Sequence, residues 1–405
     1  MDTRRFAIGA ALALAITSLP GGVAASGDTA DRGTSACGGV SGGPVATHAA
    51  SRVAAVAAAS SATPAGGVWT STPIATLRTS GSEGGFAVAD DQHATIVATD
   101  GDAAWARQTA DAGATWDPPV RLTPFGWAVL SGIATQQGSD VEIANAAYKG
   151  DRSRTFMRHS ADGGATWGST LGLPGSVYGP VLAIGAGGLV VLSATPDPTV
   201  RVRISRDGGA SFGRAVRVGA YDIGAGCVYD PGYTALAVSG GVVLVFHWQN
   251  EKKLIVHRST DGGRTWGAAR MIRAGQQGSD PIATAVNGDT VLVAFHSGQD
   301  LVIRRSTDRG LTWSPPFSFK SGGWGVSLAR ADGQWHLVYT HGHALRYRSS
   351  VNGLDWTAEE TVATYPAADS SRPLGVGILG GTVVAPWIHS FLTKDNDGLE
   401  FSARS

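Results

Sequence analysis

The chain has 405 residues and equal numbers of basic and acidic side chains, 32 of each, so its formal net charge is zero. This balance, without any basic run, excludes the electrostatic footprint of a nucleic-acid-binding protein. Hydrophobic residues make up 43% of the sequence and charged residues 16%, which is enough apolar material for a large buried core.

Residues 1–25 have the pattern of an export signal. Arg4 and Arg5 precede an apolar run, and small residues surround Val23 and Ala25, as at a signal cleavage site. The alternative is a transmembrane anchor, but the run ends at Pro20, short of the ~20 residues that a span needs. We predict a secreted or cell-surface protein with no membrane span in its mature chain. Sec and twin-arginine export both stay open.

Residues 26–66 are rich in Ala, Ser and Gly and show no periodicity. Such a composition buries too little apolar surface to fold, so we predict a disordered linker. The two cysteines are Cys37, in this linker, and Cys227, in the remainder. In an exported protein they form either one disulfide or two free thiols, and the sequence leaves both open.

A similar octet recurs six times in residues 67–405. The copies are TADAGATW at 109–116, SADGGATW at 160–167, SRDGGASF at 205–212, STDGGRTW at 259–266, STDRGLTW at 306–313 and SSVNGLDW at 349–356. The octet aromatic recurs at steps of 51, 45, 54, 47 and 43 residues, a period typical of propeller blades. Between octets, four β-rich runs are separated by turn residues, which predicts an all-β protein with four-stranded antiparallel blades.

The octet is predicted to be the hairpin between the third and fourth strand of each blade. Its Ser or Thr hydroxyl and its Asp carboxylate accept hydrogen bonds from turn N–H groups, and its fifth residue, Gly, takes a positive φ. The octet aromatic returns to pack over the neighbouring hairpin. The predicted structural aspartates are Asp111, Asp162, Asp207, Asp261 and Asp308.

The blade count follows from the strands that remain at the two ends. After the sixth octet, residues 374–379, 382–388 and 399–404 supply three more strands but no fourth. WTSTPIAT at 69–76 resembles WTAEETVAT at 356–364, which is a fourth strand. The N-terminal strand is therefore predicted to complete the C-terminal sheet and close a seven-bladed ring. A six-bladed ring with an extra tail is the alternative.

The octets resemble the Asp-box, or BNR repeat, of bacterial sialidases and other β-propellers. The resemblance covers six hairpins and implies a propeller, but it does not imply one reaction, because lectins and assembly factors also carry this box. In the family, the box lies on the face opposite the active site, and sialidases with this box have six blades. The family's Arg-Ile-Pro and Gly-Arg motifs are replaced here by EGGFAV at 83–88 and ATDGDAA at 98–104.

The candidate site follows from strand alternation, which puts the connections between blades and the second-to-third-strand loops on the face opposite the octets. Residues that start the inner strands are expected at the channel mouth, and residues that end the second strands beside it. Aromatic, charged and hydrogen-bonding groups in one concavity suit a sugar. The predicted ligand-binding residues are Tyr178, Tyr233, Trp324, His247, Trp248, His296, His341 and His389.

Three function classes stay open. We favour recognition of a glycan or glycoconjugate by an exported, monomeric propeller, with a sialidase-like exo-glycosidase and a protein-interaction propeller as alternatives. For an enzyme, the candidate catalytic residues are Asp102, Asp280 and Arg372. No cofactor is predicted, and no metal site, because the histidines lie on different blades without ligand spacing.

Overall fold

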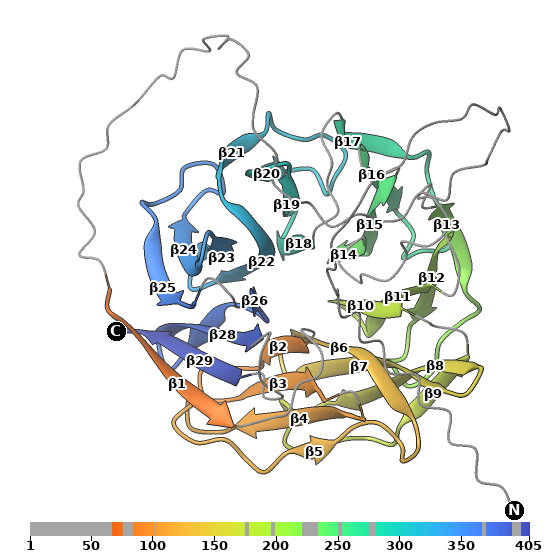
Figure 1. The fold of residues 1–405 in the computed structure, drawn as a ribbon. Helices are drawn as coiled ribbons and strands as arrows, with labels where there is room; N and C mark the ends of the chain where they lie inside the picture. The colour runs from red at the N-terminus through yellow and green to blue at the C-terminus, as the bar shows by residue number, and fades with distance from the viewer. Residues whose placement is uncertain are drawn as a thin grey trace, which may run out of the picture. The chain divides into compact units, whose positions relative to one another are not determined.

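The computed structural model describes residues 67–75, 84–100, 102–174, 178–195, 199–220, 234–249, 253–274, 281–366, 370–390 and 398–405. The predicted signal, the predicted linker and both cysteines lie outside these ranges. Within them, the chain forms seven antiparallel sheets arranged in a ring, which is a seven-bladed β-propeller (Figure 1). This confirms the predicted fold class and blade number.

The first three blades follow one another along the chain, each with its strands in sequence order from the inside outward. Blade 1 contains β2 (Gly84–Val88), β3 (Ala94–Thr99), β4 (Ala104–Thr109) and β5 (Val120–Arg121). Blade 2 contains β6 (Ala128–Gln137), β7 (Asp140–Lys149), β8 (Arg152–Ser160) and β9 (Leu171–Pro174). Blade 3 contains β10 (Tyr178–Gly185), β11 (Leu189–Thr195), β12 (Thr199–Ser205) and β13 (Val216–Ala220).

The next three blades have the same order. Blade 4 contains β14 (Thr234–Ser239), β15 (Val242–Gln249), β16 (Lys253–Ser259) and β17 (Arg270–Ala274). Blade 5 contains β18 (Ile282–Asn287), β19 (Thr290–Ser297), β20 (Asp300–Ser306) and β21 (Phe317–Lys320). Blade 6 contains β22 (Gly322–Ala331), β23 (Gln334–His341), β24 (Ala344–Ser350) and β25 (Glu360–Thr364).

Blade 7 joins the two ends of the propeller, as the sequence predicts. Its inner strands are β26 (Ser370–Pro373) and β27 (Gly377–Leu379), followed by β28 (Thr382–Ser390) and β29 (Gly398–Arg404). The outermost strand is β1 (Trp69–Ala75), which pairs antiparallel with β29 from Trp69 opposite Arg404 to Ala75 opposite Leu399. A strand from the N-terminal side thus covers an edge that would otherwise be unpaired.

The closure is reinforced by a carboxylate of blade 6. Arg404 donates from Nε to Oε2 of Glu360 at 2.8 Å and from Nη2 to Oε1 at 3.0 Å. Trp69 donates from its indole Nε1 to Oε2 of the same carboxylate at 3.2 Å. Because the two terminal strands share one acceptor on the neighbouring blade, the bidentate pair fixes blade 7 against blade 6.

The inner edge of blade 7 differs from the sequence prediction. Residues 374–379 were expected to form one continuous strand, but pairing with β28 stops after Pro373 and resumes at Gly377. Pro386 of β28 lies opposite this gap and has no N–H to donate to the ladder. Its carbonyl accepts from the Leu374 N–H at 2.9 Å, which bridges the interruption.

The core lies between blades. The described buried residues form seven hydrophobic clusters, and each cluster joins two adjacent blades, including blade 7 with blade 1. Both faces of a blade are therefore covered, so residues Val242–Trp248 of β15 are buried without alternation. In the described ranges no helical segment has the length and hydrophobicity of a membrane span.

Candidate functional site

The two faces of the propeller are defined by which connections they carry. In five blades an octet N–H donates to a carbonyl of the turn between the first and second strand of the same blade, for example Gly163 to Ser139 at 2.8 Å and Gly262 to Gly241 at 3.0 Å. The octets and these turns therefore share one face, which we call the octet face. The remaining connections form the opposite face.

The octet carboxylates are engaged within their own turns. In the second octet, Oδ1 of Asp162 accepts the Ser160 hydroxyl at 2.7 Å and the Thr166 N–H at 2.8 Å. Oδ2 of Asp162 accepts the Thr166 hydroxyl at 2.6 Å. These bonds, first that from the Thr166 hydroxyl, lower the pKa of Asp162 to about 2. An ionised carboxylate with its lone pairs already used stabilises the turn and is a poor proton donor to a substrate.

The same arrangement recurs in the other octets. The first-position hydroxyl donates to the aspartate Oδ1 over 2.6–2.8 Å in the octets of Asp111, Asp207, Asp261 and Asp308. The sixth octet has Asn352 instead, and its amide oxygen accepts from the backbone N–H groups of Leu354 and Asp355 at 2.8 and 2.9 Å. The sixth turn is one residue shorter, with Ser350 and Asn352 in the places of the hydroxyl residue and the aspartate.

Three predicted ligand-binding residues are buried. Trp248 has no exposed surface and packs edge-on against Phe295 of blade 5, with ring centroids 5.7 Å apart. His247 is 2% exposed and His296 is 1% exposed, with Nδ1 of His296 3.1 Å from the Ser321 hydroxyl oxygen. These side chains belong to the blade boundaries and not to the ligand-facing surface that the sequence predicts, because neighbouring blades cover both sides of a second strand.

His247 forms a neutral pair with His257 of the adjacent strand. Their Nε2 atoms are 3.1 Å apart, and Nδ1 of His247 is 3.1 Å from the Trp248 carbonyl oxygen. A carbonyl only accepts, so Nδ1 of His247 carries the hydrogen and its Nε2 accepts from Nε2–H of His257. Burial lowers the pKa of His247 to about 4 and also lowers that of His257. Protonation of His247 would add a hydrogen to its Nε2 and set it against the Nε2–H of His257.

His341 reaches the surface, in a cluster at the boundary of blades 5 and 6. Its Nδ1 lies 3.0 Å from Oε2 of Glu359, which also accepts the Tyr339 hydroxyl at 2.5 Å. Nε of Arg346 lies 3.3 Å from the other carboxylate oxygen. Burial raises the pKa of Tyr339, whose side chain is fully covered and packs against Phe319. Tyr339 is therefore closed to a ligand, whereas Glu359 keeps 20% of its side chain exposed beside His341.

The predicted residues of the channel mouth are placed only in part. Tyr233 and Asp280 lie outside the described residues, and of Tyr178, Trp324 and His389 only the backbone is described. Arg372 is half-buried on β26, where its backbone pairs with Ile388 of β28. The sequence predictions for these positions stay predictions.

A surface on blades 1 and 2 is the part of the opposite face that the structure describes in most detail. It is built by the loop that ends with Asp102, by the connection after β5 and by the hairpin after β7. We call it the blade 1–2 surface, and its residues are Asp102, Trp105, Arg121, Phe125, Tyr148 and Lys149.

Arg121 organises this surface. Its guanidinium carbon lies 4.6 Å from the ring centroid of Phe125 and 5.5 Å from that of Trp105. Nη2 donates to the Asp102 carbonyl at 2.8 Å and Nε to the Thr123 carbonyl at 2.9 Å. Arg121 is thus held by two hydrogen bonds and by Trp105, and it makes one cation–π contact with the Phe125 ring, which is 85% exposed.

Blade 2 continues the surface. A Cβ added to Gly126 would lie 3.2 Å from Nζ of Lys149, so the ammonium group lies over the loop that presents Phe125. Tyr148 is 43% exposed and pairs with Ala128, two residues beyond this glycine. The sequence predicts Asp102 as a site residue but gives no role to Arg121 or Phe125. Phe125 lies in a short loop without periodicity. The one sequence feature that could have indicated an exposed aromatic residue is its position between the turn residues Pro124 and Gly126.

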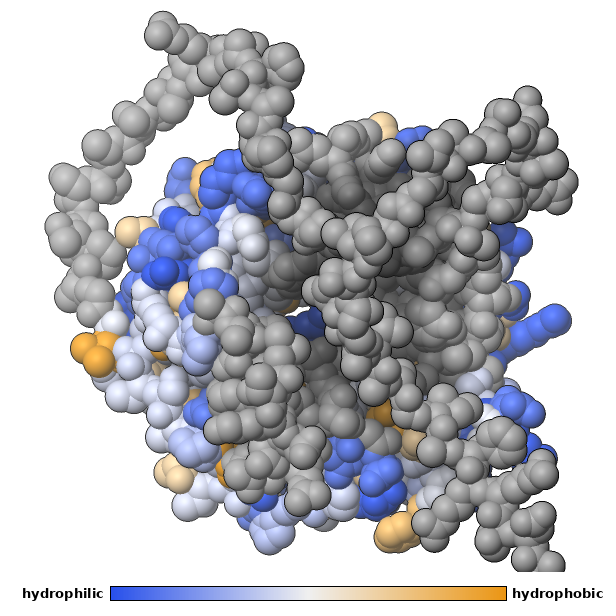
Figure 2. All heavy atoms as spheres, viewed as in Figure 1, coloured by the Kyte–Doolittle hydropathy of each residue, from blue (hydrophilic) through white to orange (hydrophobic). Residues whose placement is uncertain are grey.

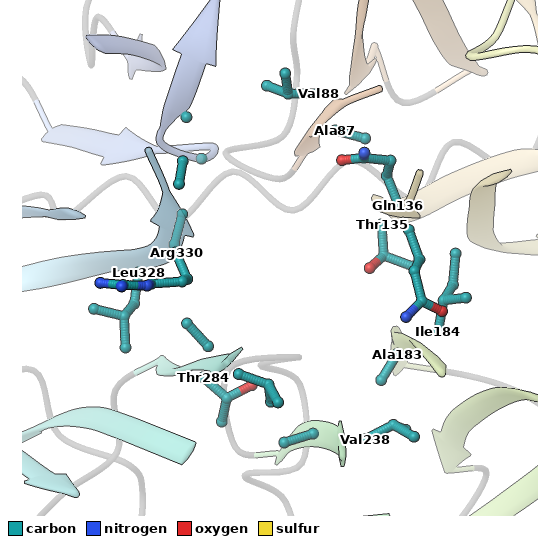
Figure 3. A pocket seen from close by; sticks show the side chains of 18 of the residues that line it. Ala87, Val88, Thr135, Gln136, Ala183, Ile184, Val238, Thr284, Leu328 and Arg330 are labelled. Carbon is teal, nitrogen blue, oxygen red and sulfur yellow. The ribbon is translucent and has the colours of Figure 1, made fainter. Parts of the chain in front are cut away.

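A cavity of about 720 Å³ occupies the channel on the octet side. It is lined by the second half of each inner strand, mostly by Ala, Leu, Val and Ile, and Figure 3 shows Gln136 and Arg330 on different sides of it. The Thr284 hydroxyl donates to the Leu236 carbonyl at 2.7 Å and the Ser239 hydroxyl to the Gly288 carbonyl at 2.5 Å. These bonds join the inner edges of β14 and β18. The two hydroxyls therefore link blade 4 to blade 5 and are not free to bind a ligand.

The described surface seen in Figure 2 is mainly hydrophilic, and its most hydrophobic residues lie scattered. Scattered apolar residues are ordinary on a soluble protein. Within the described ranges, no group of three or more His, Cys, Asp or Glu side chains is placed to hold a metal ion.

Neither a protein-family model nor a curated protein matches the sequence. Among solved structures, a streptogramin B lyase is similar with a TM-score of 0.50 and 13% identity over 83% of this chain and 98% of that chain. The NanB sialidase of Streptococcus pneumoniae gives 0.47 and 10% identity, over 82% of this chain and 70% of that one. The Aleuria aurantia lectin AAL gives 0.45 and 11% identity, over 73% and 99%. At 13% identity, the similarity to the lyase shows a shared fold alone.

Proposed function

We propose that this protein is an exported propeller that binds carbohydrate on the face opposite the octets. The observation that carries the proposal is the blade 1–2 surface, where Arg121 contacts the exposed Phe125 ring and the Asp102 carbonyl. Lys149 lies over the next residue, Gly126, and the exposed Tyr148 stands on the adjoining hairpin. Aromatic faces stack on the apolar faces of sugar rings, while a carboxylate and an ammonium group bind hydroxyls at the ring edges.

The octets support the choice of face. Their resemblance to the Asp-box implies that a ligand binds on the opposite side, and their carboxylates are already bonded within the turns. Glycan recognition therefore has its candidate groups where the loops vary between blades. The export that brings such a protein to extracellular glycans is proposed from residues 1–25 alone.

A glycan array with the protein lacking residues 1–25 identifies the ligand, and titration of variants then locates the site. Phe125→Ala should weaken binding at least about tenfold, because an aromatic anchor is typically worth about 2 kcal/mol or more. Phe317→Ala is the matched control, since Phe317 is also an exposed aromatic residue but lies on the outer strand β21. Equal loss in both variants, or none in either, would contradict the assignment.

The alternative is a sialidase-like exo-glycosidase, which is favoured by one observation. Asp102 is exposed, and its carboxylate makes no hydrogen bond within the described part of the chain, so it is free to contact a substrate. A turnover assay with a chromogenic sialoside separates the alternatives. Cleavage that is abolished in Asp102→Asn supports the enzyme, whereas glycan binding without cleavage supports the binding protein. If the protein neither binds nor cleaves a glycan, both carbohydrate functions are excluded and the protein-interaction propeller is the alternative that is left.

A further inference from the structure

A second concave site lies on the octet face, between the octets of blades 4 and 5. It is a cavity of about 330 Å³, at the lower end of the roughly 300–1,000 Å³ typical of ligand pockets. Its lining contains two arginines, two threonines and a tryptophan but no acidic side chain: Arg258, Thr260, Thr265, Trp266, Gly267, Ala268, Arg270 and Leu311.

Both guanidinium groups are anchored on one turn of blade 5. Nε of Arg258 donates to the Arg309 carbonyl at 2.9 Å, and Nη1 of Arg270 donates to the Leu311 carbonyl at 2.7 Å. The two acceptors are two residues apart, so the two cations are brought to the same place. Neither arginine forms an ion pair in the described part of the chain, and both keep N–H donors beyond the anchoring bonds.

The nearby octet carboxylates do not compensate these charges. Both oxygens of Asp261 accept bonds from Ser259 and Thr265. Both oxygens of Asp308 are used in the same way in the next octet. Two guanidinium groups in one cavity without a carboxylate repel each other, and a bound anion removes that repulsion.

The repeat shows that this pair is particular to blade 4. Four residues after the octet aromatic, the chain has Val120, Leu171, Val216, Arg270, Phe317 and Glu360 in turn. Blade 5 combines Arg305 with Phe317, and blade 6 combines Arg348 with Glu360. The turn itself thus needs no arginine at this position, and only in blade 4 do two arginines coincide.

We propose that this cavity binds a small oxyanion, of the sulfate or phosphate class, free or as a group on a larger molecule. The site lies on the face opposite the proposed carbohydrate surface and does not depend on it. Guanidinium donors match the oxygens of a tetrahedral anion, and Thr265 and Trp266 contribute to the lining beside them.

Titration calorimetry with sulfate and with phosphate, at constant ionic strength balanced with chloride, tests the proposal. Arg270→Gln should lower the affinity for both anions at least about tenfold, because a hydrogen bond to a charged group is lost. Arg264→Gln is the matched control, since Arg264 stands in the same octet but outside the cavity lining. It should bind like the unmodified protein, and so should Phe125→Ala.

A second variant tests the site with both arginines in place. Ala268→Asp adds a carboxylate to the exposed part of the lining and should abolish anion binding by supplying an internal counter-ion. The proposal is overturned if the unmodified protein binds neither anion, if Arg264→Gln loses as much affinity as Arg270→Gln, or if Ala268→Asp binds unchanged.

Discussion

The neutral pair of His247 and His257 predicts how stability depends on pH. His247 is almost fully buried, and its folded-state pKa of about 4 lies below the ordinary value of 6.5. As the pH falls through 6.5, His247 is protonated in the unfolded chain but stays neutral in the folded chain. The contribution of His247 is therefore complete above pH 6.5 and is lost as the pH falls toward 4.

The magnitude follows from the two pKa values. Between about pH 7 and about pH 4.5, this one side chain should remove about 2–3 kcal/mol from the free energy of unfolding. His247→Gln removes the titration but keeps an amide oxygen that can accept from Nε2–H of His257. Urea unfolding of the unmodified protein and of His247→Gln at the two pH values isolates the contribution of His247 to the free energy of unfolding. The other histidines titrate in both proteins, so their contributions cancel in the comparison.

The expected result is a loss in the unmodified protein that exceeds the loss in His247→Gln by about 2 kcal/mol or more. His343→Gln serves as the control for the substitution itself, because His343 is exposed and lies away from the boundary of blades 3 and 4. Parallel loss in the unmodified protein and in His247→Gln would refute the reasoning from burial and tautomers.

Three further predictions concern stability. Deleting residues 67–75 removes β1 from blade 7 and should abolish cooperative thermal unfolding, whereas unchanged unfolding would contradict closure. Asp308→Ala should cost about 1 kcal/mol in urea unfolding, because three donors lose their acceptor, and glycan affinity should not change. Burial raises the pKa of Glu142 to about 8, so its contribution is present below about pH 4.5 and is lost as the pH rises toward 8. Glu142→Gln should remove that slope, seen in urea unfolding at about pH 5 and pH 8.

The blade number and the closure could be predicted because both depend on spacing along the chain. Six octets fixed the period, and the strand at 69–76 resembled the strand that was missing at the other end. The octet aromatics were predicted to pack over the neighbouring hairpin, and two of them instead contact strands of the neighbouring blade. Trp116 meets Phe401 of blade 7 and Trp313 meets Phe246 of blade 4, with centroids 5.3 and 5.7 Å apart.

The exposure of single side chains could not be predicted in the same way. A residue's position along a second strand gives its height in the blade, but alternation does not separate inside from outside when both faces are buried. His247 contributes to the boundary with blade 3 and Trp248 to that with blade 5, so both are covered. Phe125 was missed for the opposite reason, because a short loop has no period from which exposure can be inferred.

Six copies of one hairpin in one chain also provide an internal comparison. What every copy shares, the hydroxyl, the Asp or Asn and the glycine of positive φ, forms the turn. A charged residue that interrupts an otherwise apolar position is therefore not required by the turn. Arg270 stands where Val120, Leu171 and Val216 stand in other blades, and Glu142 lies under the third octet where Leu244 and Leu292 lie under the fifth and sixth. Burying or crowding charge costs stability. Glu360 stands at the Arg270 position in the sixth copy and is balanced by Arg404 in the ring closure, whereas Arg270 forms no ion pair in the described part of the chain. Arg270 is therefore a departure that the formation of the fold does not explain.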